Sequence, residues 1–254
     1  MEVRVAGATI EEAALIFVRL LAFMMTAPVF RERAVVPVVK VGLAAGITYA
    51  LMAARPAPEA GTSDFVRFLL AMTGEMITGA LIGFASLLAL QAIEIAGAAI
   101  GMEMGLSFPA SVSPLLPSQG TVVEQWYMAM ATLFFLLING HHSLLLGFQR
   151  TLEAAPPGAF VLSGLAIDRL IAMTSTMFTS AIQIALPLMA TLIFTDLALA
   201  LISRMIAQIP VFVLGMPIKI AVGLVALIVT WPLMLPTIMR VLQRAVDNVM
   251  ILAR

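Results

Sequence analysis

The sequence predicts an all-α protein of the integral-membrane type, made of apolar helical hairpins with broken helices. Of its 254 residues, 62% are hydrophobic and 11% are charged, whereas about a quarter of the residues of an ordinary soluble domain are charged. Such a chain needs lipid or other subunits around it. Proline removes a backbone donor from a helix and kinks or breaks it. We therefore expect kinks or breaks at the later prolines, Pro187, Pro210, Pro217, Pro232 and Pro236.

Runs without ionised side chains locate the membrane spans. Each charge at the centre of a bilayer costs roughly 2.5–3.5 kcal/mol, and a span needs about 17–25 residues. Four runs meet this length: Met76–Ile93, Gln125–Gln149, Leu170–Thr195 and Ile220–Met239. Two shorter helices are expected before them, at Ala13–Pro28 and Val35–Ala54. We predict about six or seven hydrophobic helices in a single domain covering residues 1–254.

The basic residues near the two ends give conflicting membrane orientations. Lys and Arg prefer the cytoplasmic side, and residues 31–40 and 239–254 carry three each. Six spans would nevertheless place these two segments on opposite sides. One more crossing by Ile95–Pro117, or segments that do not cross lipid, would remove the conflict. Residues 239–254 are expected to form an amphipathic cytoplasmic tail.

Glycines spaced four residues apart mark helix faces that allow close packing. Gly97, Gly101 and Gly105 form the longest such stripe, which resembles the small-xxx-small pattern of membrane helices. We expect this stripe to contact another subunit, with packing inside the chain as the alternative. The same spacing recurs at Gly79/Gly83 and Gly42/Gly46. For Gly42/Gly46, packing inside the chain is the expectation.

Residues 106–120 are predicted to form a loop that faces a lumen. The segment contains three prolines and no charged residue, and proline at this density prevents a continuous helix. Irregular backbone at membrane depth is tolerated only where it is buried in protein or lines a cavity. A connector at the membrane surface is the alternative.

Ionisable residues inside apolar helices are candidates for functional sites. Arg19 stands alone on the first helix and is expected to pair with a carboxylate such as Glu75 or Glu94. Three others lie in the C-terminal third: Asp196, Arg204 and Lys219. For these, a functional role and a purely structural ion pair are both open.

No recognisable catalytic or metal-binding pattern is present in the sequence. The chain has no cysteine, and its histidines, His141 and His142, are adjacent, so that on a helix they point about 100° apart. Nucleophile, phosphate-binding and zinc-protease motifs are absent. Net charge is zero, which does not favour nucleic-acid binding. We expect neither enzymatic activity nor a cofactor or metal.

Three separated blocks of sequence occur in a specific order and spacing. The first has Arg19, then Thr26-Ala27-Pro28 and Val36-Pro37-x-x-Lys40-Val-Gly-Leu43; the second has Ile100-Gly-Met-Glu-Met-Gly-Leu-Ser-Phe108 and Leu133-Phe-Phe-Leu-Leu-Ile-Asn-Gly-His141; the third is Arg204-Met-Ile-Ala-Gln208 through Lys219. With these blocks the chain resembles the family of the flagellar biosynthetic protein FliR and its injectisome counterparts. It departs from the family pattern where Ser113-Pro114 replaces Asp-Pro and where a proline is displaced to Pro210.

The resemblance implies a subunit of the type III protein export gate in the bacterial inner membrane, within the flagellar basal body. Its fold would resemble a FliP-like chain fused to a FliQ-like chain in a helical assembly. The implied partners are FliP-like and FliQ-like subunits, FlhB, FlhA nearby, membrane lipid and unfolded export substrates. The resemblance assigns a pore plug to Phe108, Pro109, Ser111, Val112, Pro114, Leu115, Leu116 and Pro117. The resemblance also implies that five residues are buried charges or belong to a structural motif: Arg19, Glu94, Arg204, Gln208 and Lys219.

Other functions compatible with the sequence are a small-solute secondary transporter or channel and an injectisome export-gate subunit. Broken helices and buried charges also suit a transporter. An intramembrane hydrolase is disfavoured because no nucleophile motif is present.

Overall fold

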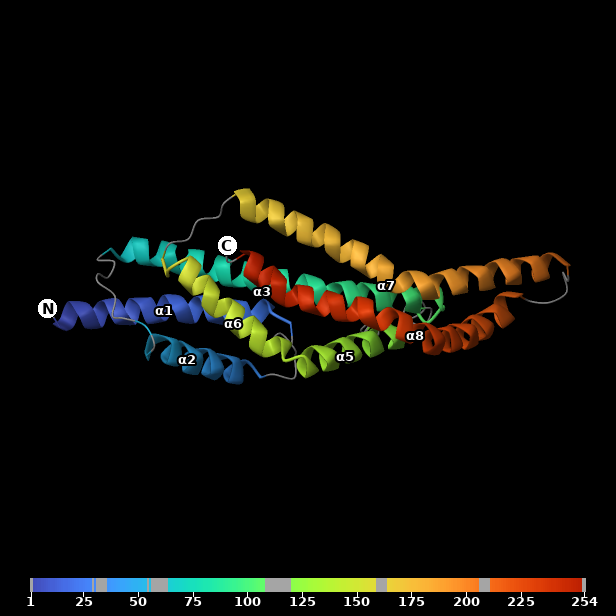
Figure 1. The fold of residues 1–254 in the computed structure, drawn as a ribbon, viewed down its shortest axis with the longest axis horizontal. Coiled ribbons are helices and arrows are strands. Elements are labelled where there is room, and N and C mark those ends of the chain that lie inside the picture. Colours follow the sequence, from blue (N-terminus) through green and yellow to red (C-terminus); the bar gives the residue numbers. More distant parts are fainter. Residues whose placement is uncertain are drawn as a thin grey trace. The chain divides into compact units, whose positions relative to one another are not determined.

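The computed structural model describes residues 2–28, 30, 36–53, 55, 64–107, 120–158, 164–205 and 211–252. Within these residues the regular structure is entirely helical, which confirms the all-α prediction (Figure 1). The helices are α1 (Glu2–Thr26), α2 (Pro37–Ala53), α3 (Phe65–Glu103), α5 (Val122–Leu137), α6 (Gly140–Ala154), α7 (Gly164–Met205) and α8 (Val211–Leu252).

The chain forms two compact units built from interleaved segments. Unit 1 comprises residues 1–88, 139–174 and 244–254, and unit 2 comprises residues 89–138 and 175–243. The chain passes from one unit to the other within α3, between α5 and α6, within α7 and within α8. The organisation of the whole chain as a single domain stays a prediction.

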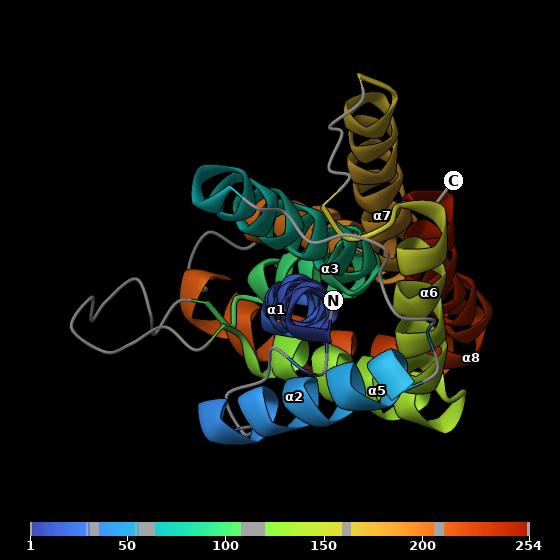
Figure 2. The ribbon, with the colours of Figure 1, turned by 90° about the vertical axis from the view of Figure 1, so that its left-hand side faces the viewer.

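In unit 1, α1 is the central helix. It lies beside α2 (Figure 1), and Figure 2 shows it nearly end-on with α2, α3 and α6 around it. Its fully buried side chains recur at helical spacing and include Ile16, Leu20 and Phe23. The ring of Phe23 lies 5.3 Å from that of Phe148 on α6. Apolar periodicity thus places α1 in the core of the unit.

The glycine pair on α3 brings this helix close to α1. A methyl group added at Gly79 would overlap the carbonyl of Arg19, and one added at Gly83 would overlap the Thr26 hydroxyl. The other pair behaves differently, because no atom lies within 4 Å of a methyl group added at Gly42 or Gly46. The prediction that Gly42 and Gly46 pack inside the chain is therefore wrong. The buried face of α2 carries Lys40, Ala44 and Thr48 instead.

Unit 2 has a core of large side chains from α5, α7 and α8. Tyr127 and Phe135 of α5 are fully buried, as is Leu188 of α7. The Tyr127 hydroxyl donates to the Met234 sulfur on α8 at 3.1 Å. The rings of Trp126 and Trp231 lie 4.3 Å apart beside this contact. These aromatic contacts hold α5 against α8.

Three described helices are long and apolar enough to cross a membrane: Phe65–Glu103, Ile167–Met205 and Gly215–Val249. They contain three of the four predicted spans. The fourth, Gln125–Gln149, is wrong as a single straight helix, because it consists of α5 and α6, which are bent at a short break. Asn139 lies at this break with φ 55°, a conformation that asparagine tolerates better than most residues. The bent pair is the broken helix expected in a chain of this class.

The end of α3 differs from expectation, and the prolines of the long helices do not break them, while kinks there stay a prediction. Residues 95–103 are the end of α3, so no separate helix begins there. Four of the predicted proline positions lie inside helices that continue through them, so a break is excluded there: Pro187, Pro217, Pro232 and Pro236. Neighbouring helices and local adjustments re-satisfy freed backbone groups in apolar helices. Pro210 lies outside the described residues.

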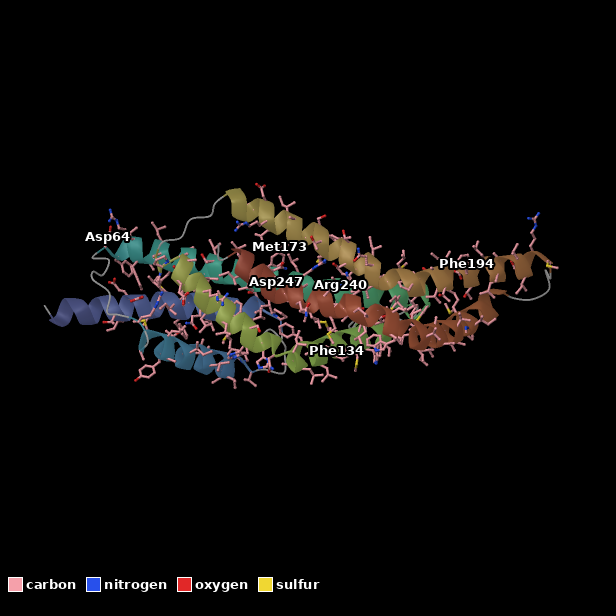
Figure 3. All side chains as sticks on the ribbon, in the orientation of Figure 1. Asp64, Phe134, Met173, Phe194, Arg240 and Asp247 are labelled. Carbon is pink, nitrogen blue, oxygen red and sulfur yellow. The ribbon has the colours of Figure 1, made fainter. Side chains whose placement is uncertain are left out.

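The C-terminal segment is not a separate helix, because residues 239–252 continue α8. In unit 1, Ala245 and Val249 are fully buried, and the Asn248 side-chain amide donates to the Ala85 carbonyl at 2.9 Å. Its described charged residues, Arg240, Arg244 and Asp247, are exposed, and Figure 3 labels Arg240 and Asp247. The apolar face of this segment therefore packs on α3 of the same chain.

Candidate functional site at the base of residues 106–120

The predicted plug lies outside the described residues, but the structure describes both of its ends. Residues 108–119 are not described. They include all of the predicted plug residues: Phe108, Pro109, Ser111, Val112, Pro114, Leu115, Leu116 and Pro117. The preceding helix end of α3 and the following helix α5 both belong to unit 2. The candidate site is therefore defined by the residues from which this segment departs and to which it returns.

Gly105 terminates α3 before the segment begins. The helix ends at Glu103, and Gly105 has φ 79°, which glycine adopts without steric cost. The Leu106 N–H donates to the Gly101 carbonyl at 3.0 Å, and the Gly105 N–H donates to the Met102 carbonyl at 2.9 Å. These two bonds form a Schellman cap. Gly105 is thus a helix stop, and the prediction that it lies on the helical glycine stripe is wrong.

A capping box starts α5 where the segment returns. Gly120 has φ 72°, and Thr121 follows as the N-cap residue. The Glu124 N–H donates to the Thr121 hydroxyl at 3.1 Å, and the Thr121 N–H donates to the Glu124 carboxylate at 3.1 Å. Two otherwise unsatisfied helix donors are satisfied in this way. The sequence motif Thr-x-x-Glu could have revealed this helix start.

The two ends of the segment are held against each other. A methyl group added at Gly101 would overlap the Thr121 side chain, and one added at Gly97 would lie 2.9 Å from the Glu124 Cα atom. Glycine at both positions therefore lets α3 and the first turn of α5 approach at backbone distance. Packing inside the chain accounts for this contact. A further contact of the stripe with another subunit stays a prediction, and it would have to lie beside α5.

Residues of α8 complete the base of the segment. The Met104 side chain fills the space over Gly223, where an added methyl group would lie 2.7 Å from the Met104 Cε atom. One turn earlier on α8, the Lys219 ammonium donates to Asp196 at 2.8 Å and to Glu103 at 3.4 Å. Of the two roles left open for Lys219 and Asp196, the structure shows an ion pair. Through Glu103 this triad ties α8 to the last residue of α3.

Two of the predicted buried polar positions differ from expectation, and one is not described. Arg204 is exposed near the end of α7, so its assignment as a buried charge is wrong. Gln208 lies outside the described residues. Glu94 is half-buried and accepts a hydrogen bond from the Gln91 side chain on its own helix. Glu94 therefore has a local partner and is not the counter-ion of Arg19.

The second polar cluster, in unit 1, contains the predicted partner of Arg19. The Arg19 guanidinium donates to both carboxylate oxygens of Glu75, with the Nη2 to Oε1 bond at 2.8 Å. Its remaining nitrogen donates to the Ala155 carbonyl at 2.9 Å and to the Thr151 carbonyl at 3.4 Å. The Gly158 N–H donates to Glu75 at 2.8 Å. Arg19 thus joins α1 to α3 and caps the C-terminus of α6.

A second arginine that the sequence did not single out acts at the same helix end. Arg55 follows α2, and it donates to the Leu152 carbonyl at 3.0 Å and to Glu12 on α1 at 3.3 Å. The last turn of a helix has carbonyl groups without helical partners. No short-range pattern signals this role, because the arginine and the helix end are 97 residues apart in the sequence.

An apolar groove of about 390 Å³ opens between α3 and α7 within unit 2. Alanine, isoleucine, leucine, phenylalanine and methionine make up its whole lining. Binding sites for small solutes usually place a few polar groups among apolar ones, and this groove has none. Among the described residues, no group of three His, Cys, Asp or Glu side chains is arranged to hold a metal ion.

Comparison with known proteins confirms the resemblance. Residues 10–245 match the model of a family described as bacterial export proteins, family 1. The chain is 35% identical over 218 residues to the flagellar biosynthetic protein FliR of Escherichia coli (strain K12), covering 86% of this chain and 83% of that one. It is 31% identical over 240 residues to the FliR of Bacillus subtilis (strain 168), covering 92% and 91%. The secretion system apparatus protein SsaT of Salmonella typhimurium is 27% identical over 166 residues, covering 63% and 62%. The chain therefore belongs to the bacterial export proteins, family 1, the family that includes FliR.

Proposed function

We propose that this chain is a pore-forming subunit of the flagellar type III export gate in the bacterial inner membrane, where it passes unfolded flagellar substrates. The joined ends of residues 106–120 carry the proposal. A loop that leaves and re-enters the helices at one place can project into a lumen without disturbing them. The names of the FliR relatives favour a flagellum, and the likeness to SsaT is the reason to keep an injectisome as the alternative.

Poor burial of the last two helices supports an assembly with other subunits. In α3, 56% of the most apolar stretch is buried inside the chain, against 22% in α7 and 17% in α8. Phe194 illustrates this exposure, since it lies on the outer face of α7 with 71% of its surface exposed (Figure 3). Apolar surface of this extent needs lipid or protein cover. We propose that FliP-like and FliQ-like subunits, FlhB and, nearby, FlhA provide it together with lipid in the basal body.

Co-purification tests the assembly. A tagged chain extracted from membranes in mild detergent should bring FliP-like and FliQ-like chains with it. The matched control is an unrelated membrane protein with the same tag at the same expression level. Recovery of the chain alone, or as a symmetric homo-oligomer, would contradict the export-gate function and favour a small-solute transporter.

Deletion of Ser111–Ser118 tests the plug. Without these residues we expect the assembled gate to leak small ions, measured as dye or potassium efflux from vesicles that contain the purified complex. The matched control is a deletion of residues 58–62, in the polar loop between α2 and α3, which should leave efflux unchanged. An unchanged efflux after the plug deletion, with the complex intact, would refute the plug assignment.

Cysteine cross-linking tests the proposed subunit contact of Gly97, Gly101 and Gly105. The chain contains no cysteine, so single cysteines introduced at Ala98 or Met102 report one position each. Met102 is 59% exposed, whereas Ile100 is fully buried and provides the control position. Disulfides between Met102→Cys and cysteines in a FliP-like chain are expected. When a second cysteine is added to the same chain, cross-links confined to that chain would exclude this contact.

A further inference from the structure

Lys40 is a buried cation for which the described part of the chain provides no counter-charge. The residue is 7% exposed and lies in the first turn of α2, which begins at Pro37. Its ammonium group is not within ion-pair distance of any described carboxylate. Burial of a charge is costly unless the charge is paired and hydrogen-bonded. The described chain alone leaves this requirement unmet.

The described acidic side chains on or beside the first three helices of unit 1 already have interactions. Glu75 pairs with Arg19, and Glu12 pairs with Arg55. Asp64 lies 3.9 Å from Arg67, and Glu11 makes an interaction of its own. A carboxylate for Lys40 must therefore come from elsewhere.

The surroundings of Lys40 indicate the character of the missing partner. On α2 the buried residues recur every fourth position as Lys40, Ala44 and Thr48, and the buried Thr48 hydroxyl has no hydrogen-bond partner among the described residues. The outward residues are apolar, with Val38 at 78% and Val39 at 57% exposure. The polarity of α2 is thus inverted relative to a helix on the surface of a soluble protein. Exposed apolar side chains of this kind need cover from lipid or protein.

Lys40 lies close to the start of α2, which begins at Pro37. Side chains on an α-helix tilt towards its N-terminus. In the first turn, this tilt directs the long lysine side chain past the start of α2. Val36, which immediately precedes the helix, is 56% exposed. A carboxylate that approaches the start of α2 from another subunit would meet exposed valines beside Lys40.

We propose that Lys40 binds an aspartate or glutamate carried by an apolar segment of another subunit. The positive charge of Lys40 requires a negatively charged partner, which a carboxylate supplies. The exposed valines around it favour an apolar segment as the carrier of that carboxylate. The proposal rests on the proposed function only in that it requires other subunits around this chain. Under this proposal, the ion pair between Lys40 and the other subunit forms at the start of α2 when the subunits assemble.

Two substitutions and one cross-linking reaction in the purified export complex test this pairing. Lys40→Met keeps the length of the side chain and removes its charge, whereas Lys40→Arg keeps the charge. Loss of one member of a buried interfacial charge pair weakens binding by about tenfold or more. Recovery of partner subunits, normalised to the amount of this chain in the membrane, should fall by about that factor for Lys40→Met and be largely kept by Lys40→Arg.

Carbodiimide treatment of the wild-type complex identifies the partner directly. The reagent joins an amine to an adjacent carboxylate as an amide, which mass spectrometry detects. We expect Lys40 linked to an acidic residue of another subunit, and no such link in Lys40→Arg, whose guanidinium does not react. Glu32→Gln is the control for a carboxylate within the chain, and it should leave both recovery and the cross-link unchanged.

Each other result would overturn the inference. Wild-type recovery with Lys40→Met, a Lys40 link only to this chain, or an intact complex without any Lys40 link would each exclude the inter-subunit pair while leaving the export-gate function standing. A wild-type chain that brings no partner subunits would instead refute the proposed function, and the inference with it.

Discussion

Two ion-pair clusters in the described part of the molecule, around Arg19 and around Lys219, differ in burial and in how completely their polar atoms are paired. In unit 1, the side chains of Arg19 and Glu75 are 1% and 0% exposed, and backbone groups at the end of α6 complete their hydrogen bonds. In unit 2, the side chains of Lys219, Asp196 and Glu103 are 19%, 44% and 29% exposed. The first cluster is enclosed, and the second is half-open.

This difference determines what each cluster contributes to the isolated chain. Removing one partner of a buried pair leaves an uncompensated charge and typically costs about 3–5 kcal/mol. An exposed pair contributes about 0.2–1 kcal/mol, because water screens it and its side chains lose entropy. The Arg19 cluster therefore fixes the packing of unit 1. The Lys219 cluster mainly sets the position of α8 relative to the end of α3.

Arg19→Met should have the largest effect on stability. The substitution leaves Glu75 buried without its cation and also removes the cap of α6, so we expect a loss of about 3–5 kcal/mol. Thermal unfolding of the purified chain in detergent measures this loss, together with the amount of chain that accumulates in the membrane.

The double variant Arg19→Met/Glu75→Leu separates the charge from the packing. Removing both charges eliminates the uncompensated carboxylate, so the double variant should be more stable than Arg19→Met alone. If the double variant were the less stable of the two, the charge of Glu75 would not be the source of the loss. Wild-type stability in Arg19→Met would contradict the enclosed character of the cluster.

Gly79→Ala should have an intermediate effect, again in unit 1. An added methyl group would overlap the Arg19 carbonyl and lie 3.1 Å from the Ala22 Cβ atom. Overpacking of this kind costs about 1–3 kcal/mol, and it would also displace the backbone that carries Arg19. The same unfolding measurement reports the loss.

Gly42→Ala is the matched control for this substitution. It lies in a helix of the same unit, but no atom is within 4 Å of the added methyl group. Alanine should therefore stabilise α2 by about 0.5–1 kcal/mol through reduced backbone entropy of the unfolded chain. Equal effects of the two substitutions would show that close packing of α3 on α1 does not matter.

The cluster that was predicted in part from the sequence is the enclosed one. Arg19 stands alone in an apolar helix, and such a charge must be paired, so a carboxylate partner was predictable. The choice between Glu75 and Glu94 was not, because it depends on which face of α3 meets α1. Arg55 and Gly158 were missed because their hydrogen bonds involve main-chain groups: Arg55 donates to the Leu152 carbonyl, and the Gly158 N–H donates to Glu75. Every residue has such groups, so the residue types in the sequence do not signal these bonds.

The ends and breaks of the helices were predicted less well than the presence of the long helices. Apolar runs located α3, α7 and α8, since length and hydropathy decide whether a segment spans. The break at Asn139 was missed because the run of apolar residues continues through it, and the decisive feature is a single left-handed residue. Gly105 was misassigned for a related reason, because the spacing of four suits both a packing stripe and a helix stop.

Of the two substitutions that remove the cation of an ion-pair cluster, Lys219→Met should have the smaller effect on stability. Its carboxylate partners are partly solvated, so we expect the isolated chain to lose less than about 1 kcal/mol. Lys219→Arg, which keeps the charge, should lose less still. A loss as large as that of Arg19→Met would mean that this cluster is as enclosed as the one in unit 1. The contrast between the two clusters would then not rest on burial, and the anchoring of α8 at the base of residues 106–120 would be a main determinant of stability.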